Sequence, residues 1–359
     1  MGEKLKLARV EVRGQTLVIT FSSEYRVLSS APLNGGLTKA KTVINHQVDK
    51  NYDHKNPEGL LESVATRLGV ERPVVGLMTA APIDKYAVSS VDGVEAIVTA
   101  GVGSGTVNMV VLIDGNLTGA AMVNTVLTAV EARSRAFHQL DIWKRGSKLL
   151  GTETDAIVIA CTGRGDLIRY AGPASKVGFK VYSCVLEAVK GALEKTEGLT
   201  GQRSFLKRLK ERGIDEEELV KVAGEMYTPH PGLESRNDFL ERVRKRLREV
   251  LSDVNVVSLV MAGFRLEEDG LNNLLPGLPA EEFRKDPVHL VADETLGMAL
   301  ACYIAGLKGL FEYVRYEKVK PGILSKLGPF LDDVLAALVA GVSSLVYSEG
   351  LRKRKNESD

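Results

Sequence analysis

The pattern of secondary-structure signals changes near residue 196, and this change constrains the fold more than any other feature of the sequence. Before it, β-branched apolar runs typical of strands alternate with long helical segments, whereas only helical periodicity remains after it. The sequence therefore predicts two domains joined by a linker at 197–202. The first (1–196) is an α/β layered domain with a mostly buried sheet, and the second (203–350) is all-α, followed by a solvated tail (351–359).

Apolar runs rich in β-branched residues mark the strands of the first domain. We expect strands at 8–12, 17–21, 26–29, 74–79, 94–100, 107–113 and 156–160. Asn56 and Pro57 are typical of a helix N-cap and first turn, and Gly69 of a helix end, so a helix is expected between them. Longer helices are expected at 119–139 and 173–195. The polar stretch 28–57 is expected to be a long loop.

Helical periodicity continues through the second domain. We expect helices at 204–212, 215–227, 237–251, 254–264, 287–306 and 331–347. Asp215 and Glu218 have the spacing of a capping box. The most apolar runs, 295–307 and 334–347, are interrupted by charge before the roughly 20 residues that a membrane-spanning helix needs. We therefore expect no membrane association.

The charges of the chain are balanced, with 47 Lys and Arg against 46 Asp and Glu and a formal net charge of +1. No global field attracts nucleic acid, so no nucleic-acid partner is expected. The three cysteines are widely spaced and lack the paired spacing of a zinc site or disulfide framework, which fits a reducing cytoplasm.

The polar stretch 28–57 concentrates side chains that could perform catalysis. It holds His46, Asp49, Asp53 and His54, with Asn34 nearby. These groups could hold a metal whose bound water attacks a carbonyl, or a carboxylate could orient a histidine that acts as general base. One imidazole could also bind a metal in the ligand itself. The alternative is a polar loop whose side chains satisfy turns and caps.

Two glycine-rich turns follow predicted strands and could bring backbone N–H groups close to a ligand oxygen. Their candidate binding residues are Gly101, Gly103, Ser104, Gly105 and Thr106 in the first turn, and Thr162, Gly163 and Arg164 in the second. Neither turn fits the P-loop or dinucleotide fingerprint, so each could equally be a tight strand exit.

Several long motifs in the first domain resemble the adenosylcobinamide amidohydrolase family. They are APLNGGLTKAKTVINHQVDKNYDHKNPEGLLESVATRLG, VGLMTAAPIDKYAV, VTAGVGSGTVNMVVLIDGNLTGAAMVNTVLTAVEARSRAF and GTETDAIVIACTGRG. The resemblance implies cleavage of the amide between a corrin propionate side chain and aminopropanol, with Asn34, His46, Asp49 and His54 as site residues and both turns as lining. Our hypothesis makes His46 and Asp49 the base pair and Asn34 an oxyanion donor. Metal use by this domain stays open.

Acidic residues pair up in the second domain. Asp293-Glu294 and Asp332-Asp333 lie in apolar helices, where adjacent carboxylates are costly to bury unless a cation neutralises them. Together with Glu317 they could hold Mg²⁺ or Mn²⁺, with Lys320 and Arg315 as phosphate contacts. Solvated helix ends are the alternative.

ERGIDEEELV, DETLG, KVKPGI and FLDDVLAALVAG resemble, in order, the phosphatidylglycerophosphatase A superfamily. One branch of it removes phosphate from α-ribazole 5′-phosphate, and fusion to a corrinoid amidohydrolase favours that branch. The whole chain resembles the bifunctional amidohydrolase and α-ribazole phosphatase family of cobamide salvage. The resemblance implies a cytoplasmic hydrolase with corrinoid and α-ribazole phosphate substrates, which could be a homo-oligomer. The alternative is that only the amidohydrolase domain is catalytic and the helical domain serves binding or oligomerisation.

Overall fold

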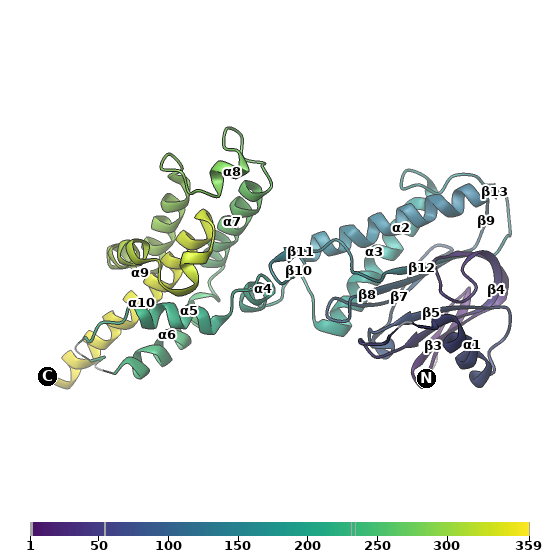
Figure 1. Cartoon of the computed structure of the whole chain (residues 1–359), viewed down its shortest axis with the longest axis horizontal. Coiled ribbons are helices and arrows are strands. Elements are labelled where there is room, and N and C mark those ends of the chain that lie inside the picture. The colour runs from purple at the N-terminus through teal and green to yellow at the C-terminus, as the bar shows by residue number, and fades with distance from the viewer. Residues whose placement is uncertain (1–2, 54, 231, 234, 359) are drawn as a thin grey trace. The chain divides into compact units, whose positions relative to one another are not determined.

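A nine-stranded sheet forms the centre of the first of two units, 1–203 and 204–359, into which the chain divides (Figure 1). The computed structural model describes residues 3–53, 55–230, 232–233 and 235–358. The strands are β1 (Glu3–Lys4), β2 (Ala8–Arg13), β3 (Thr16–Ser29), β4 (Gly36–Gln47), β5 (Val74–Thr79), β6 (Ala87–Val91), β7 (Val94–Gly101), β8 (Thr106–Ile113), β9 (Asn116–Leu117), β10 (Trp143–Lys144), β11 (Ser147–Lys148), β12 (Ala156–Cys161) and β13 (Leu167–Ile168).

The long strand β3 belongs to two parts of the sheet. The strands run in the order β1-β2-β3-β12-β8-β7-β6, while β4 pairs with β3 and, in parallel, with β5. An irregularity between Thr20 and Tyr25 interrupts the pairing of β3 with β4. Such irregularities bend a strand, and apolar side chains of β4 and β5 pack in one core with those of β7, β8 and β12. The β4–β5 part therefore lies over the main sheet.

Helices cover the outer faces of these two sheet layers. The helices are α1 (Pro57–Leu68), α2 (Gly119–Leu140) and α3 (Lys176–Glu197), with a short 3₁₀ turn η1 (Ile83–Lys85). A large apolar core joins α2 and α3 to β7 and β8, and a smaller one joins α1 to β4 and β5. Asn56 caps α1, whose Gly69 end is left-handed, as predicted. The unit is the α/β layered domain that the sequence predicts.

The expected long loop at 28–57 is wrong, because the twelve-residue strand β4 occupies its middle. Polar residues hide the strand pattern, since both of its faces are covered and the polar side chains are themselves buried. Asn45 donates to Thr99 at 2.9 Å, and Asn108 donates to Asn45 at 2.9 Å and to the Met78 carbonyl at 2.7 Å. Burying an amide that is hydrogen-bonded in this way costs little free energy, so a polar segment can form an internal strand.

The second unit is all-α, as predicted. Its helices are α4 (Phe205–Glu211), α5 (Glu216–Glu225), α6 (Arg236–Val250), α7 (Val254–Leu271), α8 (Ala280–Phe283), α9 (Ala292–Val319) and α10 (Pro329–Ser358), with the 3₁₀ turn η2 (Gly322–Lys326). The capping box of Asp215 and Glu218 is present. Helix α10 continues through most of the expected tail, where Leu351 and Arg352 are exposed.

Helix α9 is a helical hairpin, not one straight helix. Ala305 and Gly306 leave helical geometry, and Gly306 has φ +62° and ψ −152°. An added Cβ at Gly309 would lie 2.4 Å from the Ala301 carbonyl oxygen, and one at Gly297 would lie 2.7 Å from the Tyr313 hydroxyl. The second half of α9 therefore packs back against the first. The predicted helix end at Gly306 coincides with this reversal.

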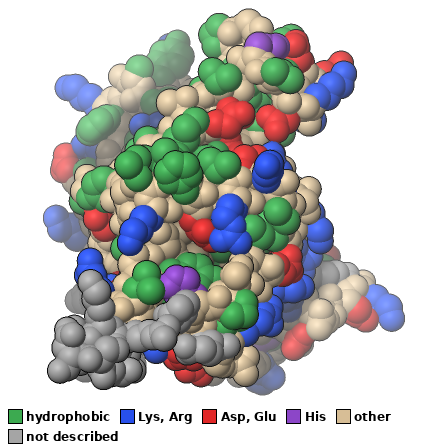
Figure 2. Space-filling model, turned by 90° about the vertical axis from the view of Figure 1, so that its left-hand side faces the viewer, with side chains coloured by type: hydrophobic (Ala, Val, Ile, Leu, Met, Phe, Trp, Pro, Cys, Tyr) green, Lys and Arg blue, Asp and Glu red, His purple; other side chains and the backbone are tan. Residues whose placement is uncertain are grey.

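Among the described residues, α9 and α10 over Pro329–Arg352 are long and apolar enough to cross a membrane by length and composition alone, although the reversal at Gly306 divides α9 into two shorter halves. The apolar windows of both helices include at most two charged residues, whereas the expectation from the sequence counted uninterrupted runs. In α10, 83% of the apolar window is buried inside the unit, as in a core helix of a globular protein. In α9 only 22% is buried, with Leu307 and Phe311 about 70% exposed. Figure 2 shows apolar side chains gathered in patches on a face of the unit.

Candidate functional sites

A cavity of about 390 Å³ opens at one end of the two sheet layers in the first unit. Its walls come from four places: the ends of β3, β4 and β5, the start of α1, the turn between β7 and β8, and the segment before β12. The lining residues are Ser30, Pro32, Val48, Asp49, Lys50, Pro57, Met78, Thr79, Ala80, Ser104, Gly105, Thr106, Glu153, Thr154, Asp155 and Ala156. The cavity thus combines apolar walls with carboxylate, ammonium and hydroxyl groups.

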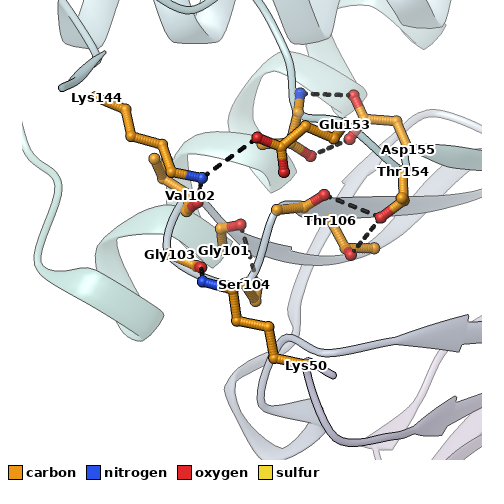
Figure 3. A network of polar contacts seen from close by, with 12 residues as sticks. Lys50, Gly101, Val102, Gly103, Ser104, Thr106, Lys144, Glu153, Thr154 and Asp155 are labelled. Atoms are coloured by element: carbon orange, nitrogen blue, oxygen red, sulfur yellow. Dashed lines mark hydrogen bonds and ion pairs between the residues drawn. The ribbon is translucent and has the colours of Figure 1, made fainter. Parts of the chain in front are cut away.

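Polar contacts fix the shape of this cavity (Figure 3). The Lys50 ammonium donates to the Gly103 carbonyl at 2.7 Å, which joins the segment after β4 to the glycine-rich turn. The Thr154 hydroxyl donates its single proton to the Gly105 carbonyl at 2.9 Å. In the 2.8 Å contact between Thr106 and Thr154, the Thr106 hydroxyl is therefore the donor. The lone pairs of Thr106 remain available to a ligand.

The cavity brings together part of the predicted site. Asp49, Ser104, Gly105 and Thr106 line it, and Gly101 and Gly103 belong to the same turn. Asp49 is exposed, and its Oδ1 accepts a hydrogen bond from the backbone N–H of Asn51 at 2.8 Å.

His46 lies near the end of β4 with its ring buried, at 7% exposure, and does not line the cavity. Its Nδ1 is 2.8 Å from the Thr16 hydroxyl, so its partner here is Thr16 and not Asp49. Burial, together with the nearby Arg67 charge, lowers the pKa of His46 below 6.5. The imidazole is therefore neutral at pH 7 and can accept a proton.

Other predicted residues lie away from this cavity. The Asn34 amide donates to the Val74 carbonyl at 2.8 Å and lines a separate hollow beside α1. Thr162, Gly163 and Arg164 follow the opposite end of β12, where the Thr162 hydroxyl donates to Asp114 at 2.9 Å. His54 lies outside the described residues. The predictions for these residues stay predictions.

The cavity also contains polar residues that we did not predict from the sequence. Lys50, Glu153 and Thr154 line it, and Glu153 lies 3.6 Å from the Lys144 ammonium. Asp155 is tied to Arg133 and to the backbone N–H of Val107, which gives it a structural role. The available signal was GTETDA, a polar run directly before an apolar strand, which is recognisable from the sequence only as part of a family-like motif.

In the second unit, three of the predicted metal ligands converge. One carboxylate oxygen from each of Asp293, Glu294 and Asp333 lies within 4.8 Å of the others. Asp293 and Asp333 are 1% and 3% exposed. Among the residues that the structure describes, Asp333 Oδ1 and Glu294 Oε2 have no hydrogen-bond partner. We call these three residues the carboxylate triad.

The other two predicted ligands surround Lys320. The Lys320 ammonium lies 2.6 Å from Asp332 Oδ2, 3.1 Å from Glu317 Oε1 and 3.4 Å from Asp286 Oδ2. Asp332 is 5% exposed, and its Oδ1 has no hydrogen-bond partner, nor has Glu317 Oε2.

Burial and crowding shift the pKa values of these acids. Burial, followed by the hydrogen bond and charge of Glu317, raises the pKa of Asp333 to about 10. Burial, with the neighbouring Glu294, raises the pKa of Asp293 to about 7. Burial also raises the pKa of Asp332 to about 6, although Lys320 acts in the opposite direction. Carboxylates that resist ionisation and keep unpartnered oxygens fit a divalent cation, which would neutralise them.

Arg315 does not join this cluster. It forms an ion pair with Glu312 at 2.8 Å and lines an open cavity of about 600 Å³ together with Phe311 and Tyr347. A phosphate contact from Arg315 stays a prediction, whereas Lys320 lies directly beside the acids.

The comparisons with known proteins divide the chain in the same way. Residues 2–201 match the family model for adenosylcobinamide amidohydrolase, and residues 273–348 match the one for phosphatidylglycerophosphatase A. An adenosylcobinamide amidohydrolase of Methanosarcina mazei is 29% identical over 200 residues, which cover 51% of this chain and 96% of that protein.

Two further matches cover smaller shares of the chain. An uncharacterised protein of Methanocaldococcus jannaschii is 37% identical over 119 residues, 31% of this chain and 91% of that protein. Among solved structures, the low temperature requirement C protein from Listeria monocytogenes aligns with a TM-score of 0.35 at 25% identity, covering 40% of this chain and 92% of that one.

Proposed function

This chain is a hydrolase that belongs to the adenosylcobinamide amidohydrolase family, and we propose that its first unit cleaves the aminopropanol amide of adenosylcobinamide to give adenosylcobyric acid. The observation that carries this proposal is the cavity of about 390 Å³, because its walls come from the segments that carry the family-like motifs. A cavity of this size suits a side arm of the corrinoid, with the macrocycle outside.

Amide hydrolysis needs a base for water, donors for the oxyanion and an acid for the leaving amine. Asp49 lies in the cavity wall, whereas the neutral His46 ring, three residues earlier in the sequence, lies outside the cavity. The Lys50 ammonium, held at the rim by Gly103, is a donor that can approach a developing oxyanion. We propose Asp49 as the residue in the cavity that moves the protons. His46 is proposed as a base on the family-like motif alone, because its ring lies outside the cavity and contacts Thr16.

Substitution of these two residues tests the amidohydrolase proposal. His46→Ala and Asp49→Asn should each lower the release of aminopropanol by about 10²- to 10⁴-fold, the usual range for a general acid or base. Asp84→Asn, at an exposed position before β6, is the matched control and should keep wild-type turnover. Circular dichroism checks that both site variants are folded. Near-normal turnover in both folded variants would refute the assignment of His46 and Asp49.

For the second unit we propose a divalent-cation-dependent phosphomonoesterase acting on α-ribazole 5′-phosphate. The convergence of the carboxylate triad supports it, as does the match to a phosphatase family. Bound Mg²⁺ or Mn²⁺ would polarise the phosphoryl group. Asp293, Glu294 and Asp333 would hold the cation, and the Lys320 ammonium would meet a phosphate oxygen beside it.

An assay of the full chain with α-ribazole 5′-phosphate and Mn²⁺ tests this half. We expect phosphate release that EDTA abolishes and that exceeds release from phosphatidylglycerophosphate. Faster release from the lipid would contradict the substrate. No release from any phosphomonoester with Mg²⁺ or Mn²⁺ would favour the alternative, a helical unit that serves binding or oligomerisation.

We also propose that the chain acts in the cytoplasm on small-molecule substrates. The balanced charge supports this, as does the burial of most of the apolar window of α10. Fractionation of cells that express the full chain should place it in the soluble fraction, and recovery with membranes would contradict the proposal.

A further inference from the structure

Lys320 is held where it neutralises one side of the acidic cluster in the second unit. It follows the last residue of α9 in the left-handed conformation, with φ +43°, and its backbone N–H donates to the Tyr316 carbonyl at 2.7 Å. The buried Pro321 comes next and restricts the chain further. Both constraints fix the backbone from which the side chain starts, and the carboxylates of Asp332, Glu317 and Asp286 hold the ammonium at its end.

The acids of the cluster fall into two groups with different counter-charges. Asp332 and Glu317 share the Lys320 ammonium at 2.6 and 3.1 Å. Within the part of the chain that the structure describes, no ion pair with Lys or Arg joins the carboxylate triad, and the unpartnered Oδ1 of the 3% exposed Asp333 belongs to it. One group thus already has its cation, and the other lacks one.

The two groups meet at the start of α10. Asp332 holds the Lys320 ammonium at 2.6 Å, and the next residue, Asp333, belongs to the carboxylate triad. Enzymes with two metal ions hold them about 3.5–4 Å apart between bridging carboxylates. An ammonium is a compact cation with three donors, which suits it to the second position.

We propose that Lys320 takes the place of a second metal ion, so that the helical unit binds a single divalent cation in the carboxylate triad. This inference rests on the proposed cation site and adds to it a stoichiometry and the residue that sets it. The phosphoryl group would then lie between one metal ion and one ammonium.

The inference is tested by measuring Mn²⁺ binding to the full chain, without an activity assay. Calorimetry gives the number of ions bound, and electron paramagnetic resonance shows whether they are isolated or coupled. Asp333→Asn reports any Mn²⁺ bound outside the triad, and that background is subtracted. The wild-type chain should bind one equivalent above background, with the spectrum of an isolated ion. Lys320→Met should bind a second equivalent and give an exchange-coupled pair. Lys318→Met, at an exposed lysine two residues earlier, should match the wild type.

The contradicting results are distinct. A coupled pair in the wild-type chain, or a single equivalent in folded Lys320→Met, would overturn the role of Lys320 alone. Equal Mn²⁺ binding by Asp333→Asn and wild type would overturn the cation site itself. Should Lys320→Met unfold, Lys320→Asn answers the same question, because asparagine tolerates the left-handed conformation.

Discussion

Burial governs the charge of the residues proposed to act in both units. The buried His46 ring keeps a lowered pKa, while the buried carboxyls Asp293 and Asp333 keep raised ones. Desolvation is the largest cause in all three cases, and it always disfavours the charged form. The histidine is therefore neutral and can accept a proton. The two acids keep their protons to a higher pH than usual, and a bound cation would favour their charged form.

The lowered pKa of His46 sets an expectation for the pH dependence of amide hydrolysis. A base works in its neutral form, so kcat/KM should fall only as the pH drops through a value below 6.5. The measurement is a pH profile of aminopropanol release from pH 4.5 to 9. An acid limb above pH 6.5, or one that persists unchanged in the residual activity of His46→Ala, would contradict the role of His46.

The raised pKa of Asp333 predicts a stability effect. A carboxyl whose pKa is higher in the folded state contributes stability at low pH that is lost as the pH rises from 3.8 to about 10. Asparagine does not titrate, so in EDTA at pH 8 Asp333→Asn should raise the Tm of the helical unit, by roughly 2–4 °C for each kcal/mol relieved.

Differential scanning fluorimetry at pH 6 and pH 8 provides the measurement for Asp333. The wild-type chain should lose stability between these two values when EDTA is present, and Mn²⁺ should restore it only in the wild type. A lower Tm in Asp333→Asn without metal would show that the carboxyl stabilises the empty site.

At this scale the sequence predicted the acids of the helical unit better than the residues of the cavity. Asp293-Glu294 and Asp332-Asp333 stand out as charges inside apolar helices, so their convergence could be predicted. Glu153 and Lys50 have no such local signal, because they line the same cavity only after the two sheet layers pack together. His46 was predicted, but its burial beside Thr16 depends on strand pairing that the polar sequence hides.

Among the elements, the α9 hairpin is the one that assembles the second site. Glu294 and Glu317 lie at opposite ends of α9, and a straight α-helix would hold them about 34 Å apart at 1.5 Å per residue. The reversal at Gly306 instead lets Tyr313 pack against Gly297 and brings both ends to the acidic cluster. One glycine thus links backbone geometry to the proposed cation site.

Gly306→Ala should weaken both the fold and the cation site. No atom lies within 4 Å of an added Cβ, so the cost comes from backbone strain, which is about 1–3 kcal/mol where only glycine fits well. We expect a lower Tm and weaker Mn²⁺ binding. Gly119→Ala, at the open first turn of α2, is the control and should change neither. Wild-type values of both quantities in Gly306→Ala would show that the hairpin does not depend on this glycine.

Most elements could be predicted from the sequence, and the exceptions share a cause. Strand β4 was missed because polar residues on both of its faces are buried and paired inside the unit, and β6 because its short run is only half apolar. Helix α7 continues seven residues beyond the predicted Phe264, through Glu267, which is buried against the start of α10. In each case the segment is more polar than a typical buried strand or helix, so its local signal is weak.

For the molecule as a whole, the two units and the two family matches follow the same division. The first match ends at residue 201 and the first unit at Arg203, next to the predicted linker at 197–202. Each unit has its own apolar core and its own candidate site. A change in hydrophobic periodicity is visible without tertiary information, whereas the cavity forms only when the two sheet layers pack together.

If one chain carries two separate hydrolytic sites, a substitution in one site should abolish one product and spare the other. Wild-type, Asp49→Asn and Asp333→Asn chains receive adenosylcobinamide and α-ribazole 5′-phosphate together with Mn²⁺, and mass spectrometry quantifies both products. Asp49→Asn should lose adenosylcobyric acid alone and Asp333→Asn α-ribazole alone, each retaining the other activity within about twofold, since independent sites act additively. Loss of both products from either single substitution, or loss of neither, would contradict the account.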